Sequence, residues 1–333
     1  MNLKNPSVGI VVLSWNDWKN TSKLLESIFK SNYNNYDIIV VDNNSNNENF
    51  EGLINWCKSK KIKINRINFK PKSRDNKKNR KNLYIYRITE IADIPFAKNL
   101  GVARGYNKGI NFALKNNYDF IVKLDCDFLV TKNFISGMVQ TLKDNRNAAT
   151  VSPKVYYYLN KKTKIIWWKG LNFSKNYFRL QRTGKGSDRR ILDKGQFKGL
   201  IKTDSICGCC VMFRSKILKK VGQLDEDFFF GPEDIEHSNR IKKYGELLVN
   251  LDHHTYHKVS QSIFVSGIKA RYYFETIGWL LIIKKMCNTK DKIIGQLYFI
   301  IRGFSHFLRL LYKKDKDPHI GFLLGLKDFF LKY

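Results

Sequence analysis

The chain has 333 residues, with 43% hydrophobic and 14% aromatic side chains, so it can bury a large core and is not an intrinsically disordered protein. Its 60 Lys and Arg against 29 Asp and Glu give a formal net charge of +31, which favours phosphate-rich partners: nucleic acid, anionic lipid or nucleotide diphosphates. Lys, Asn and Ile are abundant throughout, so a general compositional bias is an equally good explanation of the charge.

The six cysteines stand at positions 57, 126, 207, 209, 210 and 287, in no pattern typical of a disulfide framework. Cys207, Cys209 and Cys210 are close together, but no second pair has the spacing of a zinc finger. We therefore expect buried, reduced cysteines and a cytosolic location. The sequence shows neither a predicted signal peptide nor an apolar stretch long enough to span a bilayer.

The first third of the chain alternates between predicted strands and helices. Uncharged, β-branched runs predict strands at 8–14 and 36–41, and a third strand is expected at 61–69. Between them, a helix capped by Asn20 or Thr21 and a second helix at 50–59 are predicted. Strands separated by helices indicate a doubly wound, mostly parallel sheet in an α/β fold.

The segment 70–81 carries seven basic residues and one acid, and is expected to be an exposed, inserted loop. A strand at 83–88, a helix at 99–114 and a strand at 120–124 then follow. Aromatic, alternating runs over 150–206 predict antiparallel strands and loops that cover an acceptor site. A strand at 206–213 and a helix at 215–221 complete the predicted core.

The last part of the chain has helical periodicity. Apolar residues recur at 293, 297, 300, 301, 304, 307, 308 and 311, and a second stripe holds Arg302, His306, Arg309 and Lys313. A further apolar helix with lysines is predicted at 320–333. Apolar faces edged by cations are typical of helices in a membrane interface. The alternative is that these faces pack on the main domain.

Three acids follow predicted strands. Asp42 ends the second strand, and Asp125 and Asp127 end the strand at 120–124. In a parallel sheet they would share the carboxyl edge, where ligands bind in such folds. Two such carboxylates can hold a hard divalent cation against a diphosphate. Alone, Asp42 could equally be a turn residue.

Three glycines at four-residue spacing, Gly101, Gly105 and Gly109, open the helix that follows Asn99. Glycine lets a ligand approach the backbone, and a helix start offers N–H groups to phosphate. The alternative is that these glycines let the helix pack closely on the sheet.

A second acidic pair, Glu233 and Asp234, follows a Gly-Pro turn and is expected at a helix start. Adjacent like charges raise one pKa, which suits a general base, while capping of the helix is an equally good explanation. Downstream, His257 is a candidate metal ligand, because one imidazole beside a carboxylate is compatible with manganese or magnesium.

In this order, these pieces resemble the family 2 glycosyltransferases, and among them the rhamnosyltransferase-like branch. The likeness covers residues 8 to about 285. It rests on the blocks at 11–16, 40–45, 99–109, 124–127 and 221–234, with Arg240 and Gly245, and more weakly on 257–262.

The resemblance implies a GT-A fold and an inverting transfer of a hexose, rhamnose or another, from a nucleotide-diphosphate donor to an acceptor hydroxyl. It implies that Asp234 is the catalytic base, with Glu233 beside it. Asp127, Asp125 and His257 would hold Mn²⁺ or Mg²⁺. The implied donor-binding residues are Ser14, Asn16, Asp42, Asn99, Gly101, Gly105, Asn107 and Asp125. Asp42 would meet the nucleobase, and Asp125 the ribose or the metal.

Three features depart from the family pattern. Arg104 stands where a small residue is common, His237 replaces an aliphatic residue, and the basic loop at 70–81 is extra. Arg104 leaves open whether the segment at 99–109 has the shape with which the family binds phosphate.

We expect a glycosyltransferase domain at 1–265, with a nucleotide-sugar half at 1–127 and an acceptor half at 128–265. A helical segment at 266–333 is expected to associate with anionic membrane. The expected place is the cytoplasmic face of the membrane, and the expected acceptor a cell-surface glycan or lipid-linked oligosaccharide. The alternatives are a basic nucleic-acid-binding protein and a family member that binds sugars without catalysis.

Overall fold

A computed structural model of the chain describes residues 5–66, 81–171, 190–259 and 267–333. The strands are β1 (Val8–Ser14), β2 (Tyr36–Asn43), β3 (Ile64–Arg66), β4 (Lys81–Ile88), β5 (Phe120–Asp125), β6 (Phe128–Val130), β7 (Ala148–Tyr158), β8 (Lys162–Trp168), β9 (Leu200–Lys202), β10 (Cys210–Arg214) and β11 (Glu246–His257). The helices are α1 (Trp18–Phe29), α2 (Asn47–Ser59), α3 (Gly101–Lys115), α4 (Phe134–Asp144), α6 (Ser215–Val221), α7 (Glu233–Ile241), α9 (Gly267–Met286), α10 (Thr289–Tyr312) and α11 (Asp317–Lys332).

The described strands form one sheet in the order β3-β4-β2-β1-β5-β10-β7-β11-β6, with β8 beside β7 and β9 beside β11. The first five strands of this order are all parallel, as the alternation of strands and helices predicted. β10 then runs antiparallel to β5, and the sheet is mixed beyond it. The antiparallel pairings of β8 with β7 and of β9 with β11 agree with the prediction for 150–206.

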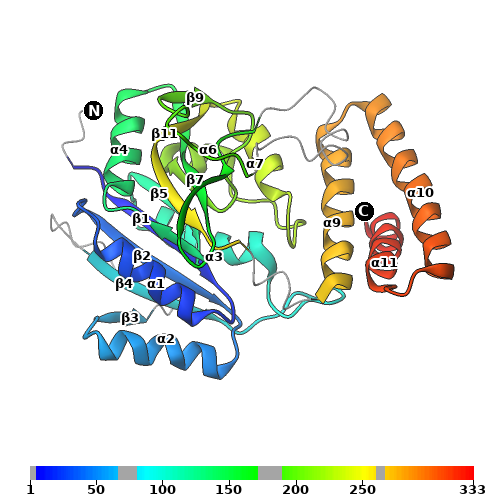
Figure 1. Cartoon of the computed structure of the whole chain (residues 1–333), viewed down its shortest axis with the longest axis horizontal. Coiled ribbons are helices and arrows are strands. Elements are labelled where there is room, and N and C mark those ends of the chain that lie inside the picture. The colour runs from blue at the N-terminus through cyan, green and yellow to red at the C-terminus, as the bar shows by residue number, and fades with distance from the viewer. Residues whose placement is uncertain (1–4, 67–80, 172–189, 260–266) are drawn as a thin grey trace.

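Helices cover both faces of the sheet, which gives three layers (Figure 1). Along β1, Val8, Ile10 and Val12 point to the side covered by α1, α2 and α4, while Val11 points to the side of α3 and α6. Both sets are fully buried, because a strand with helices on each face has no solvent side. This explains the continuous apolar run in the sequence.

Several predicted boundaries were wrong. α1 begins at Trp18, and Asp17 rather than Asn20 or Thr21 caps it, accepting from the Asn20 N–H at 3.2 Å. The strand predicted at 206–213 begins only at Cys210. The strand predicted at 61–69 begins only at Ile64; its residues 67–69 and the basic loop, except for Lys81, which begins β4, lie outside the described residues.

The last three helices form a bundle beside the sheet, with α9 next to the main body and α10 at the outer edge (Figure 1). Its core holds Phe299 of α10, Phe322 and Phe329 of α11, and Leu280 to Ile283 of α9. Among the described residues, no helix combines the length and apolarity that a membrane crossing requires.

The bundle also packs on the segment that begins α7. Phe228 and Ile235 belong to the same apolar cluster as the bundle core. At Gly278 of α9 a Cβ atom would lie 2.1 Å from the Gly231 carbonyl oxygen, so only glycine allows this approach. The bundle is therefore attached directly to the turn that carries Glu233 and Asp234.

The cationic stripe predicted on α10 was wrong at His306, which is buried and stacks on Phe322 with ring centroids 4.2 Å apart. The guanidinium of Arg302 lies 5.3 Å from the same ring. The predicted apolar stripe faces solvent instead, so packing on the main domain does not explain it. The predicted domain boundaries stay predictions, since the strands on both sides of residue 127 join the same sheet.

Candidate active site

The strand register brings three predicted residues to one edge of the sheet. Ser14 of β1 pairs with Asp42 of β2, and Leu13 pairs with Asp125 of β5. The strands are parallel, so their carboxyl ends meet there, as the sequence predicted for Asp42 and Asp125. The loops that leave this edge carry most of the remaining candidate residues.

Asp42 is buried and surrounded by stabilising groups. The Ser45 N–H donates to Asp42 Oδ2 at 3.2 Å, and Arg87 Nε of β4 lies 3.8 Å from the same oxygen. Burial raises the pKa of Asp42, while the Ser45 hydrogen bonds and the Arg87 charge act against that rise. Arg87 also stacks on Phe50 at 4.3 Å and donates to the Ser45 carbonyl. The Asp42 carboxylate is therefore held in one orientation near the end of β2, where the loop containing Ser45 begins.

The loop after β1 is tied to the loop after β2. The Asn16 N–H donates to Ser45 Oγ at 2.8 Å, and Asn16 Oδ1 accepts from the Asn46 N–H at 2.8 Å. Asn16 has a positive φ of 52°, a conformation that asparagine tolerates better than most residues. The buried Ser14 hydroxyl bonds to Thr21 Oγ1 at 2.7 Å. Through these internal hydrogen bonds, Ser14 and Asn16 fix the conformation of the loop after β1, and Asn16 also ties it to the loop after β2.

The start of α3 is held by side-chain amides. Asn99 Oδ1 accepts from the Gly101 N–H at 2.8 Å, and Asn43 Nδ2 donates to the Gly101 carbonyl at 3.1 Å. Gly105 fits against β1 and the β2 loop, because a Cβ atom there would lie 2.7 Å from Leu13 Cδ1. Close packing of the helix on the sheet therefore accounts for this glycine.

Asn107 lies on the opposite side of α3 from the strand ends and supports the loop that precedes α7. Its amide nitrogen donates to the Leu224 carbonyl and to Glu226, each at 2.9 Å, and its oxygen accepts from the Leu224 N–H. The residue is 3% exposed. These three bonds give the Asn107 side chain a structural role, and any effect on a donor would act through the loop.

The predicted metal-binding acids have different neighbours. Asp127 Oδ2 lies 3.1 Å from His257 Nε2, and the imidazole ring is stacked on Phe128 and edge-on to Trp167. Asp125 Oδ1 accepts a hydrogen bond from the Tyr106 hydroxyl of α3. Burial raises the pKa of Asp125, as does the nearby charge of Asp127, while Lys123 lowers it.

The donor set of two carboxylates and one imidazole suits Mn²⁺ or Mg²⁺. The buried His257 Nδ1 also has no hydrogen-bond partner within the described part of the chain. As the side chains stand, however, the residues that the structure describes include no group of three or more His, Cys, Asp or Glu placed to hold a metal ion. The fit to a cation is therefore partial: Asp127 and His257 are together, and Asp125 faces Tyr106.

Lys123 lies between Asp125 and the Glu233–Asp234 pair, and no role was predicted for it from the sequence. It lies on β5, two residues before Asp125, and is 2% exposed. Its ammonium lies 3.4 Å from Glu233 Oε1 and 4.4 Å from the Tyr106 ring, and it donates to the Gly208 carbonyl. Burial opposes the charge, but Glu233 and Asp125 outweigh burial and raise the pKa of Lys123.

Glu233 and Asp234 begin α7, as predicted. Glu233 is 5% exposed and paired with Lys123, whereas Asp234 is half-buried. Asp234 Oδ1 accepts from the Ile235 N–H at 2.9 Å. Burial and the adjacent charge of Glu233 together raise the pKa of Asp234 to about 7, against the opposing charge of Lys123.

The segment 207–210 lies between the two acidic pairs. The Asp125 N–H donates to the Cys209 carbonyl at 3.0 Å, and a Cβ atom on Gly208 would lie 2.7 Å from Asp234 Oδ2. Lys123 touches the same segment through the Gly208 carbonyl. Asp125, Lys123, Glu233 and Asp234 therefore form one contiguous polar cluster at the sheet edge. All six cysteines are free; Cys57, Cys207 and Cys210 are buried, as predicted, whereas Cys126, Cys209 and Cys287 are only partly buried. The cysteines of this segment pack in the apolar core.

Two of the three departures from the family pattern, Arg104 and His237, lie among the described residues. Arg104 Nε lies 3.7 Å from Glu226 on the outer side of α3, with both side chains largely exposed. His237 is fully buried, and burial lowers its pKa to about 3. His237 lies one helical turn after Glu233 on α7, with its Nε2 3.2 Å from the Gly222 carbonyl oxygen.

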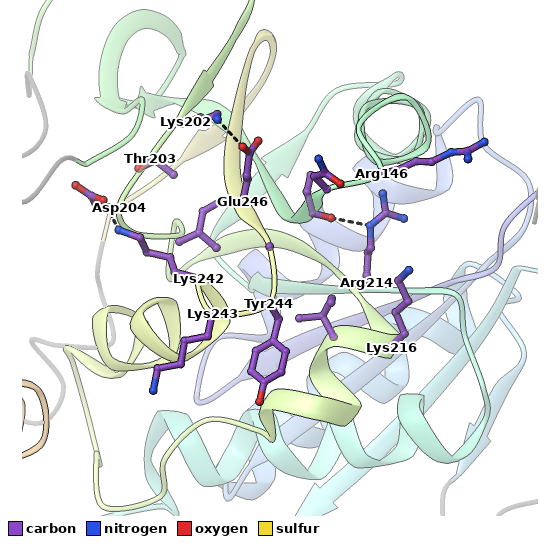
Figure 2. A pocket seen from close by; sticks show the side chains of 15 residues that line it. Arg146, Lys202, Thr203, Asp204, Arg214, Lys216, Lys242, Lys243, Tyr244 and Glu246 are labelled. Carbon is purple, nitrogen blue, oxygen red and sulfur yellow. Dashed lines mark hydrogen bonds and ion pairs between the residues drawn. The ribbon is translucent and has the colours of Figure 1, made fainter.

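A separate cavity of about 580 Å³ lies at the other end of β10, around Arg214 (Figure 2). No predicted site residue lines it. Three of its six cations are paired within the protein: Arg214 Nε donates to the Ala148 carbonyl at 2.6 Å, and Lys202 and Lys242 pair with Glu246 and Asp204. The cavity is therefore not part of the candidate active site.

Comparisons with known proteins agree with this description. Residues 77–222 match the model of the family described as Glycosyl transferase family 2. No curated protein sequence matches the chain.

Three solved structures are similar in fold. The structure titled S. aureus TarS 1-349 in complex with UDP-GlcNAc has 13% identity and a TM-score of 0.53, over 97% of this chain and 80% of that chain. The mannosyltransferase PcManGT from Pyrobaculum calidifontis, in complex with GDP-Man and Mn²⁺, has 12% identity and a TM-score of 0.53, over 99% and 88%. GalNAc-T7 with UDP, GalNAc and Mn²⁺ has 14% identity and a TM-score of 0.56, over 99% and 57%.

The resemblance to the rhamnosyltransferase-like branch is not supported by these neighbours and stays a prediction. The mixed sheet and its structural neighbours confirm the GT-A fold. The chain therefore has the GT-A fold and carries, at residues 77–222, a segment that matches the family 2 glycosyltransferases, which together support a glycosyltransferase.

Proposed function

We propose that this glycosyltransferase moves a hexose from a nucleotide-diphosphate donor to an acceptor hydroxyl, with inversion at the anomeric carbon. The acceptor oxygen bonds to the anomeric carbon, the bond to the diphosphate breaks, and the hydroxyl proton passes to Asp234. The acceptor would be a hydroxyl of a cell-surface glycan or lipid-linked oligosaccharide, as expected from the sequence. Two of the solved neighbours are complexes with nucleotide sugars, UDP-GlcNAc in one and GDP-Man in the other, which supports this class of donor.

The position and pKa of Asp234 are the observation that carries the proposal. A half-buried carboxyl with a pKa of about 7 can take a proton near neutral pH, whereas an ordinary aspartate is too weak a base. Lys123 holds Glu233 in an ion pair, which leaves Asp234 as the partly accessible member of the pair. General-base assistance of this kind is typically worth about 10²–10⁴ in rate.

Asp127 and His257, with Asp125 beside them, would hold Mn²⁺ or Mg²⁺. Such a cation would neutralise the charge of the departing diphosphate. Magnesium commonly takes only one or two carboxylates and completes its shell with phosphate oxygens and water, which suits the partial set of ligands seen here. Mn²⁺ in two of the solved neighbours supports a divalent cation.

We propose that the donor-binding residues implied by the sequence, apart from Asn107, lie under the donor at the loops of the sheet edge. Asp42 would meet the nucleobase, with Arg87 holding its orientation. Ser14, Asn16, Asn99, Gly101 and Gly105 would shape the surface under the donor, as their internal hydrogen bonds and packing support.

The test is a panel of nucleotide sugars, each with Mn²⁺ or Mg²⁺, with release of the nucleoside diphosphate measured over time. Asp234→Asn should keep donor binding by calorimetry and lose turnover by about 10²–10⁴. Asp127→Asn should lose the dependence of donor binding on the cation. Asp93→Asn, which removes an exposed carboxylate elsewhere, is the matched control.

Near-full turnover by Asp234→Asn would show that another group is the base. Donor binding without any turnover in the unaltered protein would favour a sugar-binding protein without catalysis. Binding of random DNA in place of every nucleotide sugar would favour the nucleic-acid-binding alternative. The anomeric proton of the product, followed by NMR, separates inversion from retention.

A further inference from the structure

The outer face of α10 is an exposed apolar surface. Ten large side chains on it are more than a third exposed: Ile293, Ile294, Leu297, Ile300, Ile301, Phe304, Phe307, Leu308, Leu311 and Tyr312. At 100° per residue they fall within an arc of about 140° on one side of the helix. Contiguous apolar patches of this kind on soluble proteins mark interaction sites. We call these ten residues the α10 face.

The opposite side of α10 is already used. Gly295, Phe299, Gly303 and His306 are buried against the neighbouring helices. Between Ile293 and Tyr312 the only charged residues are Arg302 and Arg309, and neither lies within the arc of the α10 face. The helix therefore has one side that holds it in the bundle and one side with no partner in the described structure.

Cations stand at both ends of the α10 face. Lys290 and Lys292 lie in its first turn, and Lys313, Lys314 and Lys316 follow its last turn. The acids nearest in sequence are Asp291, Asp315 and Asp317, so the lysines remain in excess at each end. An apolar strip with lysines at each end is complementary to an anionic bilayer, in which acyl chains lie below negatively charged headgroups.

We propose that the α10 face docks on an anionic lipid surface, with the helix axis in the plane of the membrane. The same charges argue against a second copy of this chain as the occupant. Because both ends of the face are basic, parallel and antiparallel pairing of two copies would each bring lysines against lysines. Lipid headgroups instead attract both ends.

Docking would also fix where the active site lies. α10 packs on α9, and α9 contacts the Gly231–Pro232 turn that begins α7. The bundle thus joins the docked surface to the segment that bears Asp234 through direct packing. The segment that bears Asp234 would then be held in a fixed position relative to the bilayer. This inference does not depend on the proposed function, because the binding test below measures no activity.

The test is co-sedimentation of the full chain with vesicles of phosphatidylcholine alone or mixed with phosphatidylglycerol. The double variant Ile301→Glu with Phe304→Glu should reduce partition onto anionic vesicles by at least about tenfold, since burial of each large apolar side chain alone can be worth that much. The matched control is Leu159→Glu, a 55% exposed apolar residue on the main body, which should bind like the unaltered protein. Circular dichroism verifies that each variant is folded.

A second variant isolates the charge. Lys313→Gln with Lys314→Gln should weaken binding to anionic vesicles by about fivefold per lysine at low salt and leave the weak binding to neutral vesicles unchanged. Light scattering after gel filtration, without lipid, measures self-association.

Three results would overturn the proposal. The unaltered protein could stay in the supernatant with anionic vesicles, or the double glutamate variant could sediment as well as the unaltered protein. Alternatively, the unaltered protein could be a dimer that the double glutamate variant dissociates, which would assign the α10 face to a second copy.

Discussion

Replacing Asp234 with asparagine should stabilise the protein at alkaline pH while it removes activity. In the folded protein burial and Glu233 raise the pKa of Asp234 from 3.8 to about 7. A carboxyl whose folded pKa is raised stabilises the fold least at high pH, because ionisation then favours the unfolded chain. At about 1.4 kcal/mol per pH unit, the full cost at pH 8 is about 4 kcal/mol. Since water reaches the half-buried carboxyl, we expect about 2 kcal/mol.

The amide in Asp234→Asn can still accept from the Ile235 N–H, so no hydrogen bond seen in the structure is lost. The thermal unfolding midpoint should rise by about 4 °C at pH 8, at roughly 2 °C per kcal/mol for a chain of this size. The gain should shrink by more than half by about pH 5, as the wild-type carboxyl takes up its proton. The gain in the unfolding midpoint would be lost entirely below pH 3.8, the pKa of this carboxyl in the unfolded chain.

The assay is differential scanning fluorimetry at pH 5, 6.5 and 8, with Asp93→Asn as a control that should change the midpoint by less than about 1 °C at each pH. A gain that is the same at every pH would show that packing, and not ionisation of Asp234, is responsible. A lower midpoint at pH 8 would refute the assignment of a buried, destabilising charge to this position.

Three further predictions follow from the same structure. Turnover under kcat/KM conditions should rise with pH and level off above about pH 7, because Asp234 must be unprotonated to act as the base; a flat profile from pH 5 to 8 would count against it. Lys123→Met should lower the free energy of unfolding by about 3–5 kcal/mol in urea titrations, because Glu233 is left buried without its partner. Gly109→Ala should cost about 1–3 kcal/mol, since its Cβ would lie 2.3 Å from Val11 Cγ1, whereas Lys115→Ala on the exposed side of α3 should be nearly neutral.

The sequence predicted the parallel part of the sheet well because each of its strands is a short, buried, β-branched run beside a helix with a 3.6-residue period. Asp42, Asp125 and the Glu233–Asp234 pair lay at the predicted strand ends and helix start. Glycine patterns were ambiguous, since close packing and ligand approach need the same lack of a Cβ atom. At Gly105 the structure shows packing.

The residues that were missed depend on contacts between distant parts of the chain. Lys123 stands within an apolar run and looks like an ordinary interruption until β5 is placed beside the 207–210 segment and α7. Arg87 becomes a partner of Asp42 only through the pairing of β4 with β2. The apolar stripe on α10 was found, but the sequence left both membrane contact and packing on the main domain open, because periodicity does not show which side of a helix has a neighbour.

The pairing of β11 with its neighbours has a consequence for how the protein folds. β11 joins β7 as a parallel strand and pairs His257 with Phe128, next to Asp127. The first five strands of the sheet need only residues up to 125, and can assemble from local βα units while the chain is still being made. The Asp127–His257 contact, across 130 residues, has to wait for β11. During synthesis, the part of the sheet built from residues 8–125 should therefore become protease-resistant well before the candidate cation site is complete.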